Sequence, residues 1–568
     1  MTAGWGKVRA SRHKILSLLY GFIVSRSSFL RPLSRLSSFL LLLISLFAGW
    51  MVWYVTPAGL GLTNDSAAYI GGARSLLAGT GYSDIWLDST REPLTHYPPL
   101  LSLTLSGIGL LTGLDPYRAA RALHIALFAA NTGLMGLLGF RMTKSQAASV
   151  GLALLFCANA DLLRIHAQVL SEPLFLFFSL ASFLTFSIAV EHQPGQKTTL
   201  EKPKTGNRIL DTGYWLLATG FLTALAFLTR YSALALIATF LTAIFLLSAQ
   251  ARFRRIAFFL GGVIPPIAAW FIRNSLVADS ATNRVLQFNP IQISNVRTGL
   301  WNIAHFLSPA PVMAEWMFKS GALNIFLALF GLGLLAWLAF NAWKILVQSP
   351  NSPVSKSPNP LVFTTALYIF GYLGAVLFSM SFFDASTKFQ PRILAPLYVS
   401  WMILLAAGLN TVTTKPNRAV LGWGGAILVL AVSMFSIRQS IIELREMDGL
   451  GYASWRWRQA EVLAYIRNLP PDIAIYSNSP PAVYHVTGRA SRVIPTPVNP
   501  VTGLPRSEYD QALAEMRDEL LAGRAVLVLF DVSDIEDAFG EENALQFDGL
   551  VLLVKAQGHV LYGVPEIK

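Results

Sequence analysis

The sequence has little cysteine and little charge. Its 568 residues include one cysteine, Cys157, which excludes an intrachain disulfide and a cysteine-based metal cluster. Charged residues make up 13% of the chain, whereas soluble domains carry roughly a quarter. Hydrophobic residues make up 54%, and the mean hydropathy is +0.51. This composition excludes an ordinary soluble domain and predicts an α-helical polytopic membrane protein.

The charge that is present is mostly basic, at a formal +13. A nucleic-acid partner would attract such a charge, but its distribution along the chain argues against one. The amino terminus and five loops together hold about 20 Lys and Arg against about three acids, which is the bias of cytoplasmic segments. These loops span residues 141–145, 191–212, 250–255, 344–360 and 411–418. We therefore expect a cytoplasmic amino terminus and no nucleic-acid binding.

Apolar segments long enough to cross a bilayer, or nearly so, number about eleven. They cover residues 36–55, 119–140, 146–160, 170–190, 213–229, 231–249, 256–275, 322–347, 361–380, 393–410 and 419–436. An odd number of crossings from a cytoplasmic start leaves the carboxyl-terminal region outside. The sequence thus predicts a multi-pass membrane protein, and we expect its location to be a bacterial plasma membrane.

The predicted domain boundaries follow from these segments. Residues 1–35 form a basic cytoplasmic or interfacial amino terminus, with an amphipathic helix expected over 15–24. Residues 36–436 form the transmembrane part, whose first outer loop covers 56–98. Segments 193–207 and 348–360 are rich in Pro, Ser, Lys and Asn, and we expect flexible linkers there.

Residues 437–568 differ in composition from the rest and predict an extracytoplasmic α/β domain. The patterns indicate helices over 452–469 and 506–521, strands over 473–476 and 525–530, and a closing strand pair over 547–555 and 559–564. The region lacks a glycine-rich phosphate loop, a metal-ligand cluster and a Gly-x-Ser-x-Gly elbow. We interpret it as an accessory or acceptor-binding domain rather than the centre of the chemistry.

Asp65 is the first candidate for chemistry, because it follows the first apolar segment at the predicted membrane surface. Asn64 or Asp65 could simply cap a short helix that ends at Gly79. Alternatively, the Asp65 carboxylate could act as a general base toward an acceptor hydroxyl or amine. One residue can also serve both purposes.

Other ionisable residues stand at predicted helix ends on the same outer side. Glu172 begins the fourth apolar segment in Ser-Glu-Pro, which is either a helix-start signal or a functional acid at the membrane. Arg230, Arg273, Lys388 and Arg392 face outward against the charge bias. Each could extend to lipid headgroups, but together they indicate a site for a lipid phosphate or pyrophosphate.

The first outer loop ends in His96-Tyr97-Pro98-Pro99, where the prolines indicate an extended turn before the next helix. His96 and Tyr97 are candidates for positioning a ligand. His96 could instead join Asp84, Asp88 or Glu92 in a divalent metal site, although a loop histidine is more often an ordinary surface residue. The sequence makes no cofactor certain.

Several of these stretches together resemble the GT-C superfamily of polyprenyl-phosphate-sugar-dependent glycosyltransferases. The similarity is greatest to the branch of dolichyl-phosphate-mannose protein mannosyltransferases and the bacterial aminoarabinose transferase of lipid A. It covers about residues 36–436 and rests on the order and placement of short motifs. These motifs are Asn64 to Ile70, Leu76 to Tyr82, His96 to Leu100, Ser171 to Phe175, Leu228 to Tyr231 and Arg392 to Pro396.

The resemblance implies an inverting transfer of sugar from a polyprenyl-phosphate donor to an acceptor outside the cytoplasm. It implies that Asp65 is the catalytic base, or organises it, and that Arg230, Lys388 and Arg392 hold the carrier phosphate. The family's protein mannosyltransferases have two adjacent acids after the first span, whereas Ser66 follows Asp65 here. That difference leaves the acceptor open between lipid, glycan and protein, and the sugar unassigned.

Two other functions are compatible with a polytopic membrane protein of this kind. A lipid-linked sugar transporter or flippase would be favoured by ionisable residues at mid-bilayer depth and by inverted repeats, and we find neither in the sequence. A non-catalytic scaffold for envelope assembly would use the outer domain to bind a partner.

Overall fold

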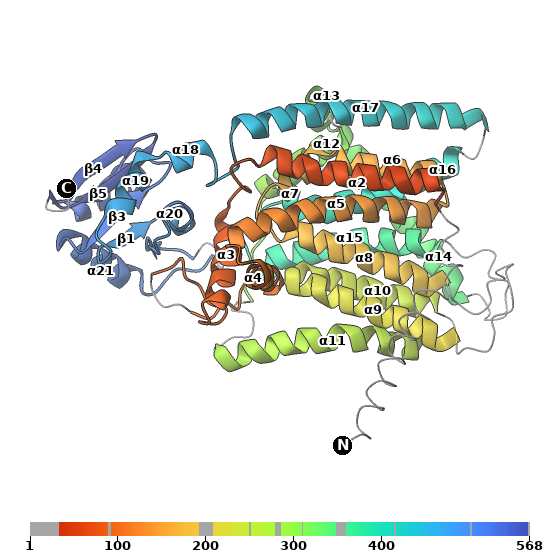
Figure 1. Ribbon diagram of the computed structural model, residues 1–568, viewed down its shortest axis with the longest axis horizontal. Coiled ribbons are helices and arrows are strands. Elements are labelled where there is room, and N and C mark those ends of the chain that lie inside the picture. Colours follow the sequence, from red (N-terminus) through yellow and green to blue (C-terminus); the bar gives the residue numbers. More distant parts are fainter. Residues whose placement is uncertain are drawn as a thin grey trace, which may run out of the picture.

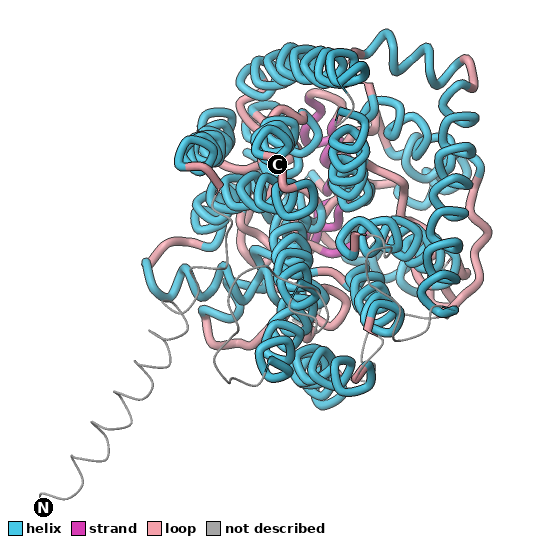
Figure 2. Tube along the Cα trace, turned by 90° about the vertical axis from the view of Figure 1, so that its right-hand side faces the viewer, coloured by secondary structure: helices cyan, strands magenta, loops and turns pink. Residues whose placement is uncertain are grey.

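The computed structural model describes residues 33–565, except 89–91, 192–207, 249–250, 279–285, 309, 348–358, 414–415 and 500–502. Long helices run side by side along the long axis of the molecule, and a small sheet with its own helices lies at one end (Figure 1). Viewed along the bundle, many of these helices are seen nearly end-on, with the strands behind them (Figure 2). The predicted amphipathic helix over 15–24 and linker 193–207 lie outside the described residues.

Nine of the described helices are long and apolar enough to cross a membrane, and ten if one bent pair counts as a span. The long helices are α2 (Arg35–Val55), α5 (Pro116–Thr143), α8 (Glu172–Glu191), α9 (Arg208–Thr229), α11 (Arg252–Val277), α14 (Ala322–Val347), α15 (Pro360–Phe382), α16 (Pro391–Thr413) and α17 (Pro416–Glu446). The bent pair is α6 (Gln146–Cys157) with α7 (Ala160–His166). The chain is thus a multi-pass integral membrane protein.

Each of the predicted apolar segments is helical, but two are not continuous spans. The segment 146–160 breaks after Cys157, and α6 and α7 meet at a bend of 63°. The break has a local cause, because the Asn159 side chain accepts a hydrogen bond from Leu162 N at 2.9 Å and so begins a new helix. The segment 231–249 forms a short 3-10 turn, η1 (Tyr231–Ala233), and then α10 (Leu234–Leu247).

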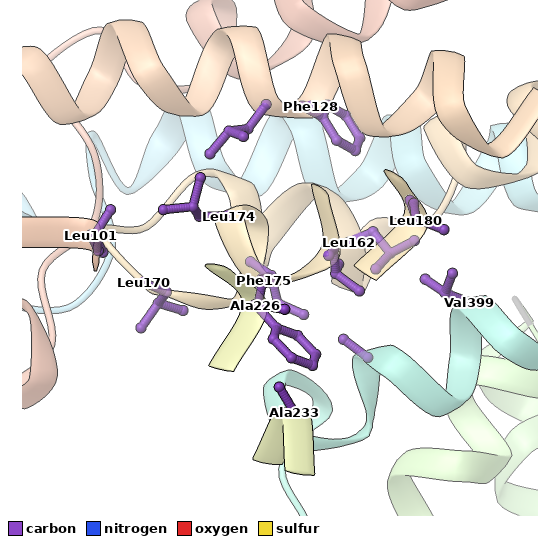
Figure 3. Packing of buried hydrophobic residues seen from close by; sticks show 14 of the residues in the cluster. Leu101, Phe128, Leu162, Leu170, Leu174, Phe175, Leu180, Ala226, Ala233 and Val399 are labelled. Carbon is purple, nitrogen blue, oxygen red and sulfur yellow. The ribbon is translucent and has the colours of Figure 1, made fainter. Parts of the chain in front are cut away.

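The core of the membrane part lies where helices from distant parts of the sequence converge. The side chains in Figure 3 come from several elements and point into one region: Leu101, Phe128, Leu162, Leu170, Leu174, Phe175, Leu180, Ala226, Ala233 and Val399. All of these are buried. By contrast, only 11% of an 18-residue apolar stretch is buried in each of α14 and α17. Most of the apolar surface of these two helices therefore faces outward, as it does in lipid-facing helices.

Two helices lie between α2 and α5, at the end of the bundle that faces the sheet (Figure 1). They are α3 (Asn64–Leu77) and α4 (Leu100–Thr112). Two further short helices, α12 (Ile293–Leu307) and α13 (Pro311–Lys319), precede α14. Thr63, rather than Asn64 or Asp65, is the residue that caps α3, and its backbone N–H donates to Ser66 Oγ at 2.9 Å. The helix ends at Leu77, two residues before the predicted Gly79.

The carboxyl-terminal α/β region contains a five-stranded sheet in the order β2-β1-β3-β5-β4. β1 (Ala474–Ser477) pairs in parallel with β2 (Arg492–Val493) and β3 (Ala525–Leu529). β5 (His559–Gly563) pairs antiparallel with both β3 and β4 (Val551–Ala556). The remaining elements are α18 (Trp455–Arg458), α19 (Glu461–Asn468), α20 (Pro480–Thr487), α21 (Tyr509–Leu521), α22 (Ile535–Phe539), α23 (Glu541–Ala544) and η3 (Leu545–Phe547).

The predicted α/β character of this region is confirmed, with changes in detail. The helix predicted over 452–469 is two short helices, α18 and α19. The closing strand pair is present, and its turn has positive φ at Gln557 (56°) and Gly558 (79°). The patterns did not indicate β2 or α20, because a two-residue strand and an eight-residue helix are too short to show a period.

Three chain segments far apart in the sequence form a small ribbon just before α3. Gly61 N donates to Ala167 O at 2.8 Å, and Val169 N donates back to Gly61 O at 2.9 Å. On the other side, Leu62 N donates to Leu450 O and Tyr452 N donates to Leu62 O, both at 3.0 Å. The segment 61–62 is therefore clamped between the residues before α8 and the residues after α17.

Gly451 allows the pairing of Leu62 with Leu450 and Tyr452 in this ribbon to form. Its φ is +57°, and a Cβ built there would lie 2.1 Å from Leu62 O. A Gly451→Ala variant therefore has to separate the two segments, because a backbone oxygen cannot give way as a flexible side chain can. We expect the thermal unfolding midpoint of the purified protein to fall by several degrees, measured in detergent.

Gly488 provides the matched control for that variant. It also has a positive φ, +78°, but a Cβ there would meet nothing within 4 Å. Gly488→Ala therefore carries only the backbone strain, of order 1 kcal/mol. Equal shifts for the two variants would show that the close approach to Leu62 does not matter.

Candidate active site

Asp65 lies in the first turn of α3, at the end of the helical bundle, and its side chain is 25% exposed. It does not act as a helix cap. Its Oδ2 forms an ion pair with Arg392 Nη1, and its Oδ1 accepts a long hydrogen bond of 3.3 Å from the Tyr97 hydroxyl. The first turn of a helix also favours a negative charge. The structure therefore places the Asp65 carboxylate in a charged cluster and removes the simple capping explanation.

The neighbours of Asp65 hold it in the ionised form. Burial alone would raise the pKa of its carboxyl, but the charge and hydrogen bond of Arg392 outweigh burial, and the more distant charge of Arg230 adds to them. The pKa of Asp65 therefore lies below its ordinary value, and the group carries a negative charge at neutral pH. For Tyr97, burial and the nearby charge of Asp65 raise the pKa well above 10, so its hydroxyl stays a hydrogen-bond donor.

A second ion pair lies behind the first. Glu172 is the first residue of α8, and its Oε1 lies 2.6 Å from Nη1 of Arg230, which follows α9. The Glu172 side chain is 2% exposed and that of Arg230 is 19% exposed. Ser171 Oγ accepts from Arg230 Nη1 at 3.1 Å and from the Tyr69 hydroxyl at 3.0 Å. Because Tyr69 belongs to α3, this chain of contacts links the buried pair to the helix that carries Asp65.

A cavity of about 360 Å³ opens beside Asp65. Its wall also includes residues that were not among the predicted site residues: Thr63, Asn64, Asp161, Arg164, Ile165, Gln168, Leu170, Gln390 and Pro391. Asp161 is the most relevant of these, because it places a second carboxylate in the cavity that contains Asp65 and Arg392. An acid and a base, Asp161 and Arg164, in an otherwise apolar stretch were the available signal for this wall. Their role stayed hidden because the helix break at Ala158 was not predicted.

The structure does not bring all the predicted site residues to this cavity. Arg273 donates from Nη1 to Leu94 O at 2.7 Å and from Nη2 to Tyr82 O at 3.0 Å, so it holds the first loop in place. The side chain of Lys388 is exposed, two residues before Gln390 of the cavity wall. His96 is half-buried with its ring against Tyr97, at 5.2 Å between centroids.

The metal site that His96 could have joined does not fit the residues around it. No group of three or more His, Cys, Asp and Glu side chains within the described ranges is placed to hold a metal ion. Asp88 Oδ2 instead pairs with Arg492 Nε at 3.4 Å. Burial raises the pKa of Asp84 to about 6, which disfavours the charged form that a metal needs. In the cavity, Asp65 is already committed to Arg392. We therefore derive no chemistry through a metal.

Comparison with known proteins gives a family match over part of the chain. Residues 75–277 match the family described as dolichyl-phosphate-mannose-protein mannosyltransferase. The match includes Glu172, Arg230 and Asp161, whereas Asp65 and Arg392 lie outside it. No curated protein sequence matches the chain significantly.

Solved structures show the same fold at low sequence identity. ArnT from Cupriavidus metallidurans bound to undecaprenyl phosphate has a TM-score of 0.54 at 13% identity, over 92% of this chain and 97% of ArnT. Archaeal oligosaccharyltransferase AglB from Archaeoglobus fulgidus, in complex with an inhibitory peptide and a dolichol-phosphate, has a TM-score of 0.53 at 12% identity, over 90% of this chain and 71% of AglB. The Archaeoglobus fulgidus oligosaccharyltransferase in complex with Zn and sulfate has a TM-score of 0.52 at 12% identity, over 88% and 69%.

These observations agree on the class of protein. The shared fold is that of a helical membrane protein with a carboxyl-terminal α/β region. The family match covers the helices that follow α3 and supply Glu172 and Arg230. Over residues 75–277 the chain is therefore similar to the dolichyl-phosphate-mannose-protein mannosyltransferase family, and its fold is similar to the folds of ArnT and AglB.

Proposed function

We propose that the protein transfers a sugar from a polyprenyl-phosphate carrier to an acceptor outside the cytoplasm, with inversion at the anomeric carbon and Asp65 as the general base. The main observation behind this proposal is that Asp65 and Arg392 form an ion pair and line the same cavity. A carboxylate whose pKa is lowered by its neighbours stands beside a guanidinium suited to phosphate oxygens. The same pairing supports a lipid carrier such as undecaprenyl or dolichyl phosphate, which the ArnT and AglB structures contain.

The proposed step uses both members of this pair. An acceptor hydroxyl or amine attacks the anomeric carbon, its proton passes to Asp65, and the bond from that carbon to the phosphate oxygen breaks. The polyprenyl phosphate leaves with the bonding electrons. Arg392 stabilises the charge on the departing phosphate, and Arg230 adds positive charge from behind the cavity. Attack from the face opposite the phosphate inverts the configuration.

Competition between Asp65 and a bound phosphate for Arg392 also changes the pKa of Asp65. While Asp65 alone holds Arg392, its pKa is low and the carboxylate is a weak proton acceptor. A bound phosphate competes for the guanidinium, which raises the pKa of Asp65 toward its ordinary value. Donor binding therefore prepares the base for the proton that it has to accept.

The outward location of the site is part of the proposal. Its support is the basic bias of the predicted inner loops, which puts α3 and the carboxyl-terminal α/β region on the opposite side. The first loop carries more acids than bases and does not share that bias. The acceptor, whether lipid, glycan or protein, would then reach the cavity from outside the cytoplasm.

The test incubates the purified protein with a panel of radiolabelled undecaprenyl-phosphate sugars in detergent and in vesicles. We expect transfer to an added acceptor, or slow hydrolysis to free sugar and undecaprenyl phosphate, with at least one donor. An Arg392→Gln variant should raise the donor KM about tenfold or more, because a charge-assisted phosphate contact is lost. Arg456→Gln, at an exposed position of the α/β region, is the matched control.

The alternatives predict different outcomes from the same assay. A flippase would move the intact labelled lipid between leaflets without cleaving it. A scaffold would do neither. Either result with the full donor panel would overturn the proposal.

A further inference from the structure

The parallel strands of the sheet end at a place where open α/β sheets commonly bind ligands. From β1 the chain passes through α20 to β2 on one side, and then through α21 to β3 on the other side of β1. The carboxyl ends of β1 and β3 therefore flank a point where the strand order reverses, and such a point leaves a crevice. In this protein Tyr452 lies there, with its ring against Trp457 at 4.9 Å between centroids and Trp457 against Phe530 at 5.2 Å. Phe530 directly follows β3.

Tyr452 connects this sheet edge to the helix of the candidate base. Its hydroxyl donates to Asn64 Oδ1 at 2.5 Å and lies 2.8 Å from Ser479 Oγ, two residues past β1. A tyrosine hydroxyl has one proton. Because that proton goes to Asn64, the Ser479 hydroxyl donates to Tyr452. Asn64 is the neighbour of Asp65 and the first residue of α3.

The other end of α3 is held by the same region. Arg74 in its last turn donates from Nη1 to the Tyr484 hydroxyl of α20 at 3.0 Å, and its Nε pairs with Asp115 Oδ2 at 2.8 Å. The backbone ribbon through Leu62 and Tyr452 adds a third connection. α3 thus contacts the α/β region at both of its ends.

We propose that the carboxyl-terminal α/β region is a positioning element for the transfer reaction, with Tyr452 as the positioning residue that holds α3 and keeps the Asp65 carboxylate at the cavity. The inference rests on the proposed function, in which Asp65 is the base. Tyr452 occupies the place at the carboxyl ends of β1 and β3 where a ligand could otherwise bind. Tyr452 itself does not line the cavity and acts through Asn64.

The kinetic test is a Tyr452→Phe variant of the full-length protein, assayed with a donor that the wild type turns over. Phenylalanine keeps the ring packing and loses the bond to Asn64. We expect kcat to fall about tenfold, because a loosened base spends less time in the reactive geometry. Donor KM should change less than twofold, because the proposed phosphate contacts come from Arg392 and Arg230. A merely destabilised protein would lose active fraction, and the thermal unfolding midpoint measures that separately.

Two further comparisons sharpen this test. Tyr509→Phe is the matched control, because Tyr509 packs in the same α/β region on α21, away from α3. The double variant Asn64→Ala/Tyr452→Phe should have a kcat no lower than that of the slower single variant, since each change removes the same hydrogen bond between Tyr452 and Asn64. Additive losses would show that Tyr452 does not act through Asn64. Ser479→Ala should lower kcat in the same direction and by less.

Hydrogen exchange provides a test that does not depend on turnover. In Tyr452→Phe we expect the backbone amides of residues 62–68 to exchange at least tenfold faster than in the wild type, with those of β3 unchanged. Unchanged exchange in 62–68 overturns the positioning role, even if Asp65 proves to be the base. If no donor is turned over, the proposed function fails, and the exchange result alone decides whether Tyr452 holds α3.

Discussion

Replacing Asp65 by asparagine is expected to abolish sugar transfer while leaving the protein folded. Asparagine has nearly the same shape, and its one amide oxygen can keep one of the two hydrogen bonds that Arg392 and Tyr97 donate to the carboxylate, but it cannot accept a proton from the acceptor. General-base assistance contributes about a hundredfold to ten-thousandfold to a rate, so kcat should fall by that order. The measurement is kcat with the radiolabelled donor that gives the highest wild-type turnover. Binding of undecaprenyl phosphate should not weaken, because the neutral amide competes less with the phosphate for Arg392, and the unfolding midpoint should fall little, because this ion pair is partly exposed.

The control for this variant is Asp510→Asn, at an exposed acid on α21. Its activity should match the wild type. An active Asp65→Asn enzyme would show that another group takes the proton. Asp161 would then be the next candidate, because it is the other carboxylate on the wall of the same cavity.

Removing Glu172 should have the largest effect on stability. In Glu172→Ala, Arg230 loses its counter-ion, yet its side chain stays only 19% exposed among the helix ends. Breaking a buried ion pair from one side commonly destabilises a protein by about 3–5 kcal/mol. We expect a clear drop in the unfolding midpoint in detergent, together with weaker donor binding, because Arg230 is no longer held behind the cavity.

Two matched variants test whether burial is the reason. Glu315→Ala removes the acid from the exposed Glu315–Lys319 pair on α13, and its midpoint should match the wild type. The double variant Glu172→Leu/Arg230→Leu removes both charges and should recover part of the lost stability. If Glu172→Ala melts at the same temperature as Glu315→Ala, the pair does not stabilise the fold.

The sequence was informative wherever one local property decides the structure. Bilayer-length apolar runs are enough to predict α2, α5 and α8, because a membrane-spanning backbone has to satisfy its own hydrogen bonds. The helix break after Cys157 could not be predicted from the apolar pattern. It depends on the Asn159 side chain, which caps a new helix where the first helix could have continued. The identity of the α3 cap was missed for a similar reason, because Thr63, Asn64 and Asp65 all suit that position.

The candidate site could be predicted as a set of residues but not as a geometry. Asp65, Arg230 and Arg392 are candidates because of their places at predicted helix ends on the outer side, and Glu172 because an ionisable group at the start of a membrane helix is costly unless it has a partner or a use. Their pairing could not be derived, since Asp65 and Arg392 are separated by 327 residues and no local pattern relates them. Arg273 looked equivalent to Arg230 in the sequence, and only its contacts with the carbonyls of Tyr82 and Leu94 distinguish it.

The contact of Tyr452 with Asn64 also sets an order for biosynthesis. The two residues are 388 positions apart, and every helix from α5 to α17 lies between them in the sequence. All of these helices are synthesised before Tyr452 is. During all that time α3 lacks its outer clamp. If Asp65 is the base, as we propose, a nascent chain that already contains Asp65, Glu172 and Arg392 would hold that base loosely until Tyr452 and the residues around it emerge.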